Sequence, residues 1–180
     1  MAPAHISQGS PGEALGSMLW KVIILGIAAG MLLPTAQAQI DTAVVSAPST
    51  GEARFLALTN SERALRGARP LRWDETLCRA GRQHSQEMAT LAYFDHRSPV
   101  RGLESPADRW EAANPKAPAE YSIAENIFYG SVADVTWSHR SLMNSPDHRA
   151  NILNPRYTHM GVGVYVSASG EMWVTEMFVS

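Results

Sequence analysis

The spacing of apolar residues in the first half of the chain predicts two long helices. Over residues 52–66, one helical face carries Phe55, Leu58, Glu62 and Leu65. Gly67 follows at a position that a helix C-terminus favours. A second helix is expected over 75–92, with Asp74 as its N-cap. Its inward stripe has spacings of four, three, four and three residues and consists of Leu77, Gly81, His84, Met88 and Leu91.

The middle of the chain has a weaker pattern. Residues 97–120 contain four prolines and are expected to be irregular, apart from a short helix over 105–113. Residues 122–129 carry no decisive periodicity. Residues 132–143 favour a helix, with packing side chains at Val132, Val135, Trp137 and Leu142.

The last third predicts one short helix and a closing hairpin. The helix covers 145–153 and ends at Asn154-Pro155, because a residue before proline avoids the helical conformation. Segments 161–166 and 172–178 alternate in the manner of strands, and "SASG" between them supplies the turn. Three tryptophans are expected in the core, namely Trp73, Trp137 and Trp173.

The N-terminal segment has the features of an export signal. Residues 22–33 are apolar, Lys21 precedes them, and Ala36-Gln37-Ala38 forms an A-x-A cleavage signal. We therefore expect a signal peptide over 1–38, a flexible lead-in over 39–51 and one domain over 52–180. The alternative is an uncleaved anchor, although the apolar run is shorter than the roughly 20 residues of a spanning helix.

Composition is that of an ordinary globular protein. Apolar residues make up 45 %, charged residues 18 %, and the formal net charge is −2. This charge favours neither a nucleic-acid partner nor attraction to anionic lipid. Cys78 is the single cysteine, so no internal disulfide can form, and we expect a buried, inert thiol.

Common catalytic signatures are absent from the sequence. There is no G-x-S-x-G elbow, no H-E-x-x-H helix and no phosphate-binding glycine loop. Glu125 lies between apolar neighbours, and a buried carboxylate needs a partner. His148 falls in the first turn of a helix that begins at Ser145-Pro146, where the helix dipole disfavours imidazolium. Asp147 has the opposite effect, which leaves the charge state of His148 open.

Seven segments, in order, resemble the CAP superfamily, the SCP-like group of cysteine-rich secretory, antigen 5 and pathogenesis-related 1 proteins. The resemblance covers about residues 54–179 and is closest to the bacterial branch. The segments are Asn60 with Arg63, "PLRWD" at 70–74 with Leu77, "HSQEM" at 84–88, "FDHRSP" at 94–99, "AENI" at 124–127, "NSPDHRANIL" at 144–153 with "GVGV" at 161–164, and "WVTEMF" at 173–178.

The resemblance implies an α+β fold, a three-layer α-β-α sandwich, with a cleft lined by histidines and acids. His96, Glu125 and His148 match the family positions in that cleft. The second acid of eukaryotic members has no clear match. Other departures are Ala124 for Gly, Asp147 for Gly, Leu142 for Trp and Glu176 for Gln.

A structural role is the alternative for each of these residues. His96 then belongs to a loop, Glu125 bonds to the backbone, and His148 is a satisfied residue at a helix start. His84 lies on the core stripe of the second helix and is read as structural, hydrogen-bonded beneath the cleft.

Three functions fit a secreted or periplasmic domain of this kind. The first is a non-enzymatic binding module whose cleft holds a metal, a small apolar molecule or a peptide. Zn²⁺ would bind through His96 and His148. The second is a metal-assisted hydrolase or protease of the cell envelope, with Glu125 as general base. The third is a scaffold whose 97–120 loop binds a partner. A small molecule, a lipid, or an envelope or extracellular protein is therefore the expected partner.

Overall fold

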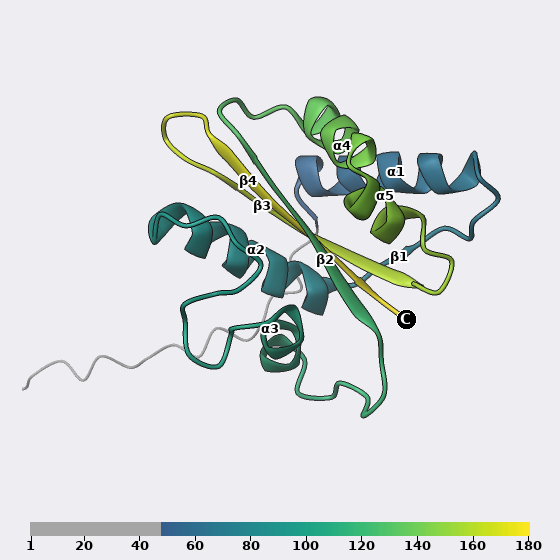
Figure 1. Ribbon diagram of the computed structural model, residues 1–180, viewed down its shortest axis with the longest axis horizontal. Coiled ribbons are helices and arrows are strands. Elements are labelled where there is room, and N and C mark those ends of the chain that lie inside the picture. The colour runs from purple at the N-terminus through teal and green to yellow at the C-terminus, as the bar shows by residue number, and fades with distance from the viewer. Residues whose placement is uncertain (1–47) are drawn as a thin grey trace, which may run out of the picture. The chain divides into compact units, whose positions relative to one another are not determined.

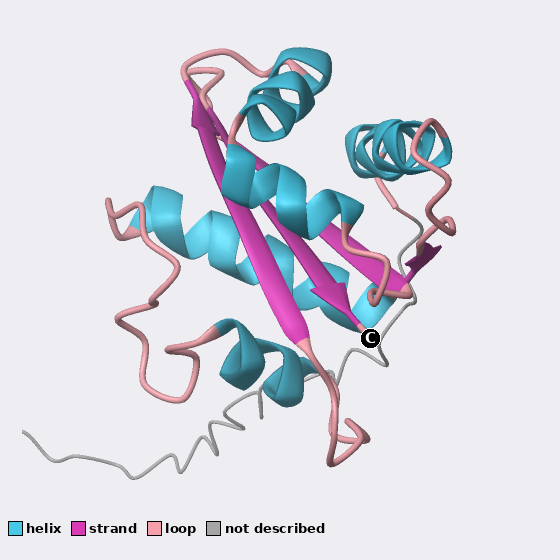
Figure 2. Cartoon of the chain, turned by 45° about the vertical axis from the view of Figure 1, so that its right-hand side comes forward, coloured by secondary structure: helices cyan, strands magenta, loops and turns pink. Residues whose placement is uncertain are grey.

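The computed structural model describes residues 48–180, which form a three-layer α-β-α sandwich (Figures 1 and 2). The predicted α+β fold class is confirmed. The elements in chain order are α1 (Thr50–Ala64), β1 (Arg72–Trp73), α2 (Glu75–Thr90), α3 (Pro106–Ala113), β2 (Ile123–Gly130), α4 (Val135–Asn144), α5 (Pro146–Leu153), β3 (His159–Val166) and β4 (Met172–Val179). The expected signal peptide and most of the lead-in lie outside the described residues.

The central sheet has the strand order β1-β3-β4-β2. β1 runs parallel to β3, while β4 pairs antiparallel with both β3 and β2. α2 and α3 cover one face, and α1, α4 and α5 cover the other (Figure 1). The ambiguous segment 122–129 is therefore the edge strand β2, and the predicted β3–β4 hairpin is confirmed. No helix within residues 48–180 has the length and apolar character to cross a membrane.

Helix α2 begins as predicted, and α1 packs differently from the prediction. The Asp74 carboxylate accepts hydrogen bonds from the amides of Thr76 and Leu77 at 2.8 and 3.0 Å. Of the four residues expected on one face of α1, Phe55 is buried, whereas Leu65 is 78 % exposed. The buried residues of α1 are Glu52, Phe55, Thr59 and Arg63. Three of these residues are polar, so the spacing of apolar residues along the sequence could not identify them.

The close packing of α2 on β3 requires glycine. Gly161 and Gly163 are buried in β3 and face α2. A Cβ on Gly163 would lie 2.0 Å from the backbone nitrogen of Arg82, and one on Gly161 would lie 2.4 Å from that of Cys78. The "GVGV" pattern therefore lets the helix backbone rest directly on the sheet.

The core differs from the prediction at its tryptophans. Trp137 is 51 % exposed, and Trp73 and Trp173 are only half-buried. Among residues 48–180, the buried tryptophan is Trp110 of α3, whose indole N–H donates to the Thr76 hydroxyl at 2.9 Å. Cys78 is fully buried, and burial raises the pKa of its thiol, which keeps it protonated.

We predict that Gly163→Ala lowers the free energy of unfolding by about 3 kcal/mol or more, because the methyl group would overlap the α2 backbone. Urea unfolding followed by circular dichroism measures the change. Gly51→Ala is the control, since the nearest side-chain atom lies 3.7 Å from its added Cβ. Equal stability of Gly163→Ala and the parent protein would contradict the close-packing account.

Candidate functional site

The candidate site is built around the buried carboxylate of Glu125 on β2. One of its oxygens, Oε1, accepts a hydrogen bond from Nδ1 of His96 at 2.9 Å. The other, Oε2, accepts from Nη2 of Arg109 at 2.6 Å. The Glu125 side chain is 1 % exposed, and that of Arg109 is fully buried, so the two charges compensate each other away from solvent.

Arg109 also fixes the loop that carries His96. Its Nη2 donates to the His96 carbonyl at 3.0 Å, and its Nη1 donates to the carbonyl of Leu103 at 2.9 Å. Helix α3 holds Arg109 in place through a capping box between Ser105 and Asp108. The sequence reasoning missed Arg109. Its only signal was a charged residue beside an aromatic one in a short predicted helix.

His84 lies beneath this group, as the sequence reasoning expected. Its Nε2 is 3.1 Å from the Asp95 carbonyl and 3.8 Å from Oε1 of Glu125. The hydroxyl of Tyr93 is 3.2 Å from its Nδ1. Burial lowers the pKa of His84, which favours neutral imidazole. His84 therefore supports the loop from within the core.

The two histidines that the sequence placed in a cleft differ in the direction in which their pKa values are shifted. The hydrogen bond to Glu125 raises the pKa of His96, against the effect of partial burial. Burial lowers the pKa of His148, and the charge of His96 lowers it further, while Asp147 acts in the opposite direction. Of the two imidazoles, His148 is therefore the one that favours the neutral form.

A second buried network positions His148 from the other face of the sheet. Asn126 of β2 donates from Nδ2 to the His148 carbonyl at 3.1 Å and to Oε2 of Glu176 at 3.0 Å. Its Oδ1 accepts from Nδ2 of Asn151 at 2.9 Å. These contacts fasten the beginning and the middle of α5 to the sheet. Ser145 precedes the helix, but its side chain makes no cap hydrogen bond.

Glu176 is the unusual member of this network. It is fully buried, and its Oε1 has no hydrogen-bond partner among the described residues. Burial raises the pKa of Glu176 to about 7. The sequence showed only that glutamate stands where glutamine is usual, and the structure places that carboxyl opposite Asn126 in the β2–β4 register.

An apolar groove lies beside His148. Its cavity volume is about 410 Å³, and its lining consists of Phe94, Ile127, Phe128, Tyr129, Ser141, Leu142, Ser145 and His148. Phe94 is 51 % exposed and Tyr129 is 42 % exposed. Their ring centroids are 6.4 Å apart, and the ring centroids of Tyr129 and Trp173 are 5.1 Å apart. The groove therefore has an aromatic rim, which histidine-centred reasoning had missed.

The remaining histidines lie apart from this arrangement. His139 is buried in α4, and neither of its ring nitrogens has a partner among the described residues. His159 begins β3 and bonds to the Thr158 hydroxyl at 2.9 Å. Arg149 donates from Nη1 to the Met143 carbonyl at 3.1 Å, which ties α5 to the end of α4.

The side chains present offer an incomplete set of metal ligands. Within residues 48–180, no three His, Cys, Asp or Glu side chains are grouped so that they could hold a metal ion. Oε1 of Glu125 is already hydrogen-bonded to Nδ1 of His96, and Oε2 of Glu125 is hydrogen-bonded to Arg109. Nε2 of His96 and the ring of His148 remain, which is fewer than the three or four protein ligands of usual zinc sites.

Comparison with known families decides the identity of the domain. The family model described as CAP, the cysteine-rich secretory protein family, matches residues 56–178. The chain belongs to this family. The match includes all the segments that carry His96, Glu125 and His148, so the CAP resemblance expected from the sequence is confirmed.

Similar proteins place this CAP domain in the bacterial branch. It is 42 % identical to YkwD of Bacillus subtilis (strain 168), covering 77 % of this chain and 50 % of that protein. It is 37 % identical to YlbC of the same organism, which is named a membrane protein, covering 64 % of this chain and 32 % of that protein. The chain thus spans half or less of the length of these relatives.

Solved structures agree on the fold. An extracellular, SCP-domain protein from Bacillus anthracis str. Ames has a TM-score of 0.63 and 28 % identity, covering 74 % of this chain and 45 % of that one. An outer surface protein from Borrelia burgdorferi has a TM-score of 0.60 and 14 % identity, covering 71 % of this chain and 90 % of that one. The second likeness shows the CAP fold alone.

We predict that Glu176→Gln alters the pH dependence of stability. Because the folded pKa of about 7 lies above the ordinary value of 4.5, the wild-type carboxyl stabilises the fold fully below about pH 4.5. That contribution disappears as the pH rises through 7. The variant should therefore exceed wild type by about 3 kcal/mol at pH 9 and lose this advantage at pH 4.

Urea unfolding between pH 4 and pH 9 measures this difference. The control is Glu111→Gln, which removes an exposed carboxylate that pairs with Tyr121. Parallel pH profiles for Glu176→Gln and wild type would contradict the buried, proton-binding role of Glu176.

Proposed function

We propose that this CAP domain is an exported binding module that holds a small, mainly apolar molecule in the groove beside His148. The observation that carries the proposal is the groove itself. Its volume of about 410 Å³ lies within the range of small-molecule sites, and its walls are mainly aromatic and aliphatic. Ser141, Ser145 and His148 provide a few polar groups that could orient the ligand.

The contacts of Glu125 favour binding over catalysis. A general base needs a carboxylate oxygen that can reach the substrate or a water molecule. Both oxygens of Glu125 instead accept hydrogen bonds from His96 and Arg109, and the side chain is 1 % exposed. These contacts fit a carboxylate that orients His96, and they argue against Glu125 as the base of a hydrolase.

A zinc ion bound by His96 and His148 is a less supported form of the proposal. A carboxylate on Nδ1 of His96 would orient its Nε2 toward a metal, as is common in zinc sites. The raised pKa of His96 acts against this, since a metal ligand must be deprotonated. With two imidazoles and solvent as ligands, we expect the groove rather than a metal to supply most of the binding energy.

Export is part of the proposal and rests on two observations. Residues 21–38 have the charge, apolar run and A-x-A signal of a cleavable signal peptide. The similar Bacillus anthracis protein is described as extracellular. A secreted or periplasmic location follows if cleavage occurs after Ala38, which mass spectrometry of the protein from its native host tests.

We predict that a fluorescent dansyl-labelled undecanoic acid binds to one site and that Phe94→Ser weakens binding about fivefold to tenfold, because it removes an apolar wall. Ser141→Phe, which fills the groove, should have an equal or larger effect. Fluorescence titration measures both. The control is Leu65→Ser, since Leu65 is 78 % exposed and lies outside the groove.

The same titration separates the alternatives. Binding should be unchanged by a chelator or by added zinc chloride, because the apolar walls provide the contact. Loss of probe binding in chelator, restored by zinc and abolished in His96→Ala and His148→Ala, would replace the apolar-ligand proposal with the metal site. Equal affinity for all groove variants would contradict the groove as the binding site.

A further inference from the structure

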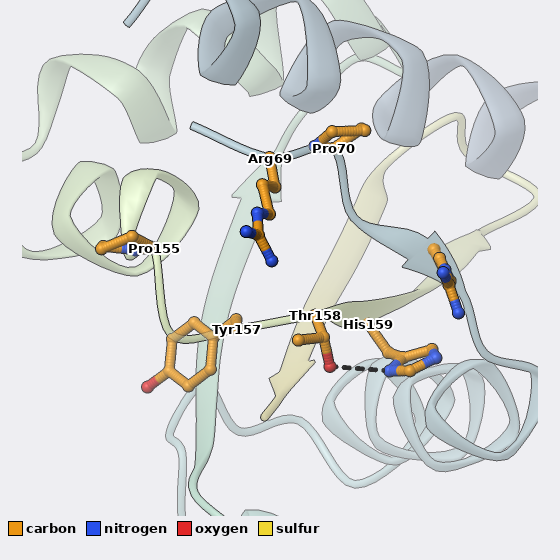
Figure 3. A pocket seen from close by; sticks show the side chains of 7 residues that line it. Arg69, Pro70, Pro155, Tyr157, Thr158 and His159 are labelled. Carbon is orange, nitrogen blue, oxygen red and sulfur yellow. Dashed lines mark hydrogen bonds between the residues drawn. The ribbon is translucent and has the colours of Figure 1, made fainter. Parts of the chain in front are cut away.

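A second cavity lies between the loop that precedes β1 and the loop that joins α5 to β3 (Figure 3). Its volume is about 320 Å³, and its lining consists of Arg69, Pro70, Arg72, Pro155, Tyr157, Thr158 and His159. It has no lining residue in common with the apolar groove. The function proposed above makes no use of this cavity.

The lining of this cavity is basic. Arg69 and Arg72 provide two guanidinium groups, His159 adds an imidazole, and none of the lining residues is acidic. Among residues 48–180, neither guanidinium has a carboxylate partner. In Figure 3 the Arg69 side chain extends into the space between Tyr157 and Thr158. The two arginines therefore present charged donors to the cavity, and no acceptor for either guanidinium lies among the described residues.

A buried arginine holds the two walls of the cavity together. Arg63 of α1 is fully buried and donates from Nε to the Arg69 carbonyl at 2.8 Å. Its Nη1 donates to the carbonyls of Ile152 and Asn154 at 2.8 and 2.9 Å, and its Nη2 to that of Tyr157 at 3.4 Å. Every one of these acceptors is a backbone carbonyl.

These contacts have two consequences for the cavity. The loop containing Arg69 and the loop containing Tyr157 are fixed relative to each other before any ligand arrives. The positive charge of Arg63 has no carboxylate partner among the ion pairs of residues 48–180, so it adds to the positive potential around the two loops that it joins.

Asn60, the other residue of the Asn60–Arg63 motif, fixes the chain on the Arg69 side of the cavity. The Asn60 side chain accepts from the Leu71 amide at 2.7 Å and donates to the Leu71 carbonyl at 3.0 Å. This pair of hydrogen bonds holds the chain between Pro70 and Arg72. The Asn60–Arg63 pair, which the sequence showed only as a family motif, therefore builds the frame of this cavity.

Two lining residues are placed side by side by strand pairing. Arg72 of β1 is the register partner of His159 in β3. Nδ1 of His159 lies 2.9 Å from the Thr158 hydroxyl, drawn as the dashed line in Figure 3. This contact occupies Nδ1, so Nε2 is the ring nitrogen left for a ligand.

We propose that this cavity binds the phosphate group of a small phosphorylated sugar or polyol. Planar guanidinium groups donate pairs of hydrogen bonds to phosphate oxygens, and two such groups with an imidazole suit a tetrahedral anion that has several acceptors. The volume of about 320 Å³ exceeds the needs of the phosphate alone and leaves room for an attached sugar or polyol.

The test is a titration of the protein with sn-glycerol 3-phosphate, followed by NMR of backbone amides and by calorimetry. The variants are Arg69→Gln and Arg72→Gln, whose side chains are exposed, so their loss should not unfold the protein. The Arg69 backbone carbonyl that Arg63 holds is retained. Arg156→Gln is the matched control, because Arg156 is exposed on the same loop as Pro155 and does not line the cavity.

We expect saturable binding, with shifts at the amides of Arg72, Thr158 and His159, and about tenfold weaker binding in each lining variant. The control should bind as wild type does. Affinity should fall as salt is raised, because the contacts are ionic. Absence of saturation at about 10 mM ligand would overturn the proposal. So would an equal loss of affinity in Arg156→Gln, because it would show that the ligand is attracted by diffuse positive charge.

Two further ligands identify the source of the phosphate. Inorganic phosphate that binds as tightly as glycerol 3-phosphate supports the site and shows that the attached polyol adds nothing. Phosphatidylglycerol vesicles are the second ligand. If they bind through Arg69 and Arg72 while soluble phosphates do not bind, the proposal of a soluble sugar or polyol phosphate is overturned in favour of a lipid headgroup. Glycerol is the uncharged control, and its binding at the same amides would contradict phosphate recognition.

Discussion

The buried carboxylate of Glu125 is the constraint on which the candidate site depends. A carboxylate that is 1 % exposed needs compensation, and Arg109 and His96 provide it at 2.6 and 2.9 Å. Arg109 also binds the His96 carbonyl, so one charge pair joins α3, β2 and the loop between α2 and α3. The position of the His96 side chain follows from the need to satisfy one buried charge.

Polar networks fasten the other irregular parts of this CAP domain in a similar way. Asn126 and Glu176 connect the sheet to the α5 residue His148. Arg63 connects α1 to the loops around Arg69 and Tyr157. Because the sequence contains one cysteine, no internal disulfide can hold these segments together. Buried side-chain hydrogen bonds to backbone carbonyls therefore shape both the candidate cleft and the basic cavity.

The sequence predicted the elements with strong local signals and missed contacts between distant segments. Asp74 and the β3–β4 hairpin were visible because capping and alternation are local. The buried face of α1 was predicted only in part. Phe55 is buried as its spacing suggests, but Arg63 was missed because its acceptors lie up to 94 residues away. Arg109 and Asn126 were missed for the same reason, since the partner that explains each lies in another element.

The most direct test of this account is the pKa of His96, measured by NMR titration in wild type and in Glu125→Gln. The account predicts a wild-type pKa above the ordinary value for histidine and a lower one in the variant, because the hydrogen bond to the carboxylate stabilises imidazolium. Glu111→Gln should leave the pKa of His96 unchanged. The same pKa in wild type and in a folded Glu125→Gln variant would contradict the claim that a hydrogen bond to the Glu125 carboxylate holds His96 in place.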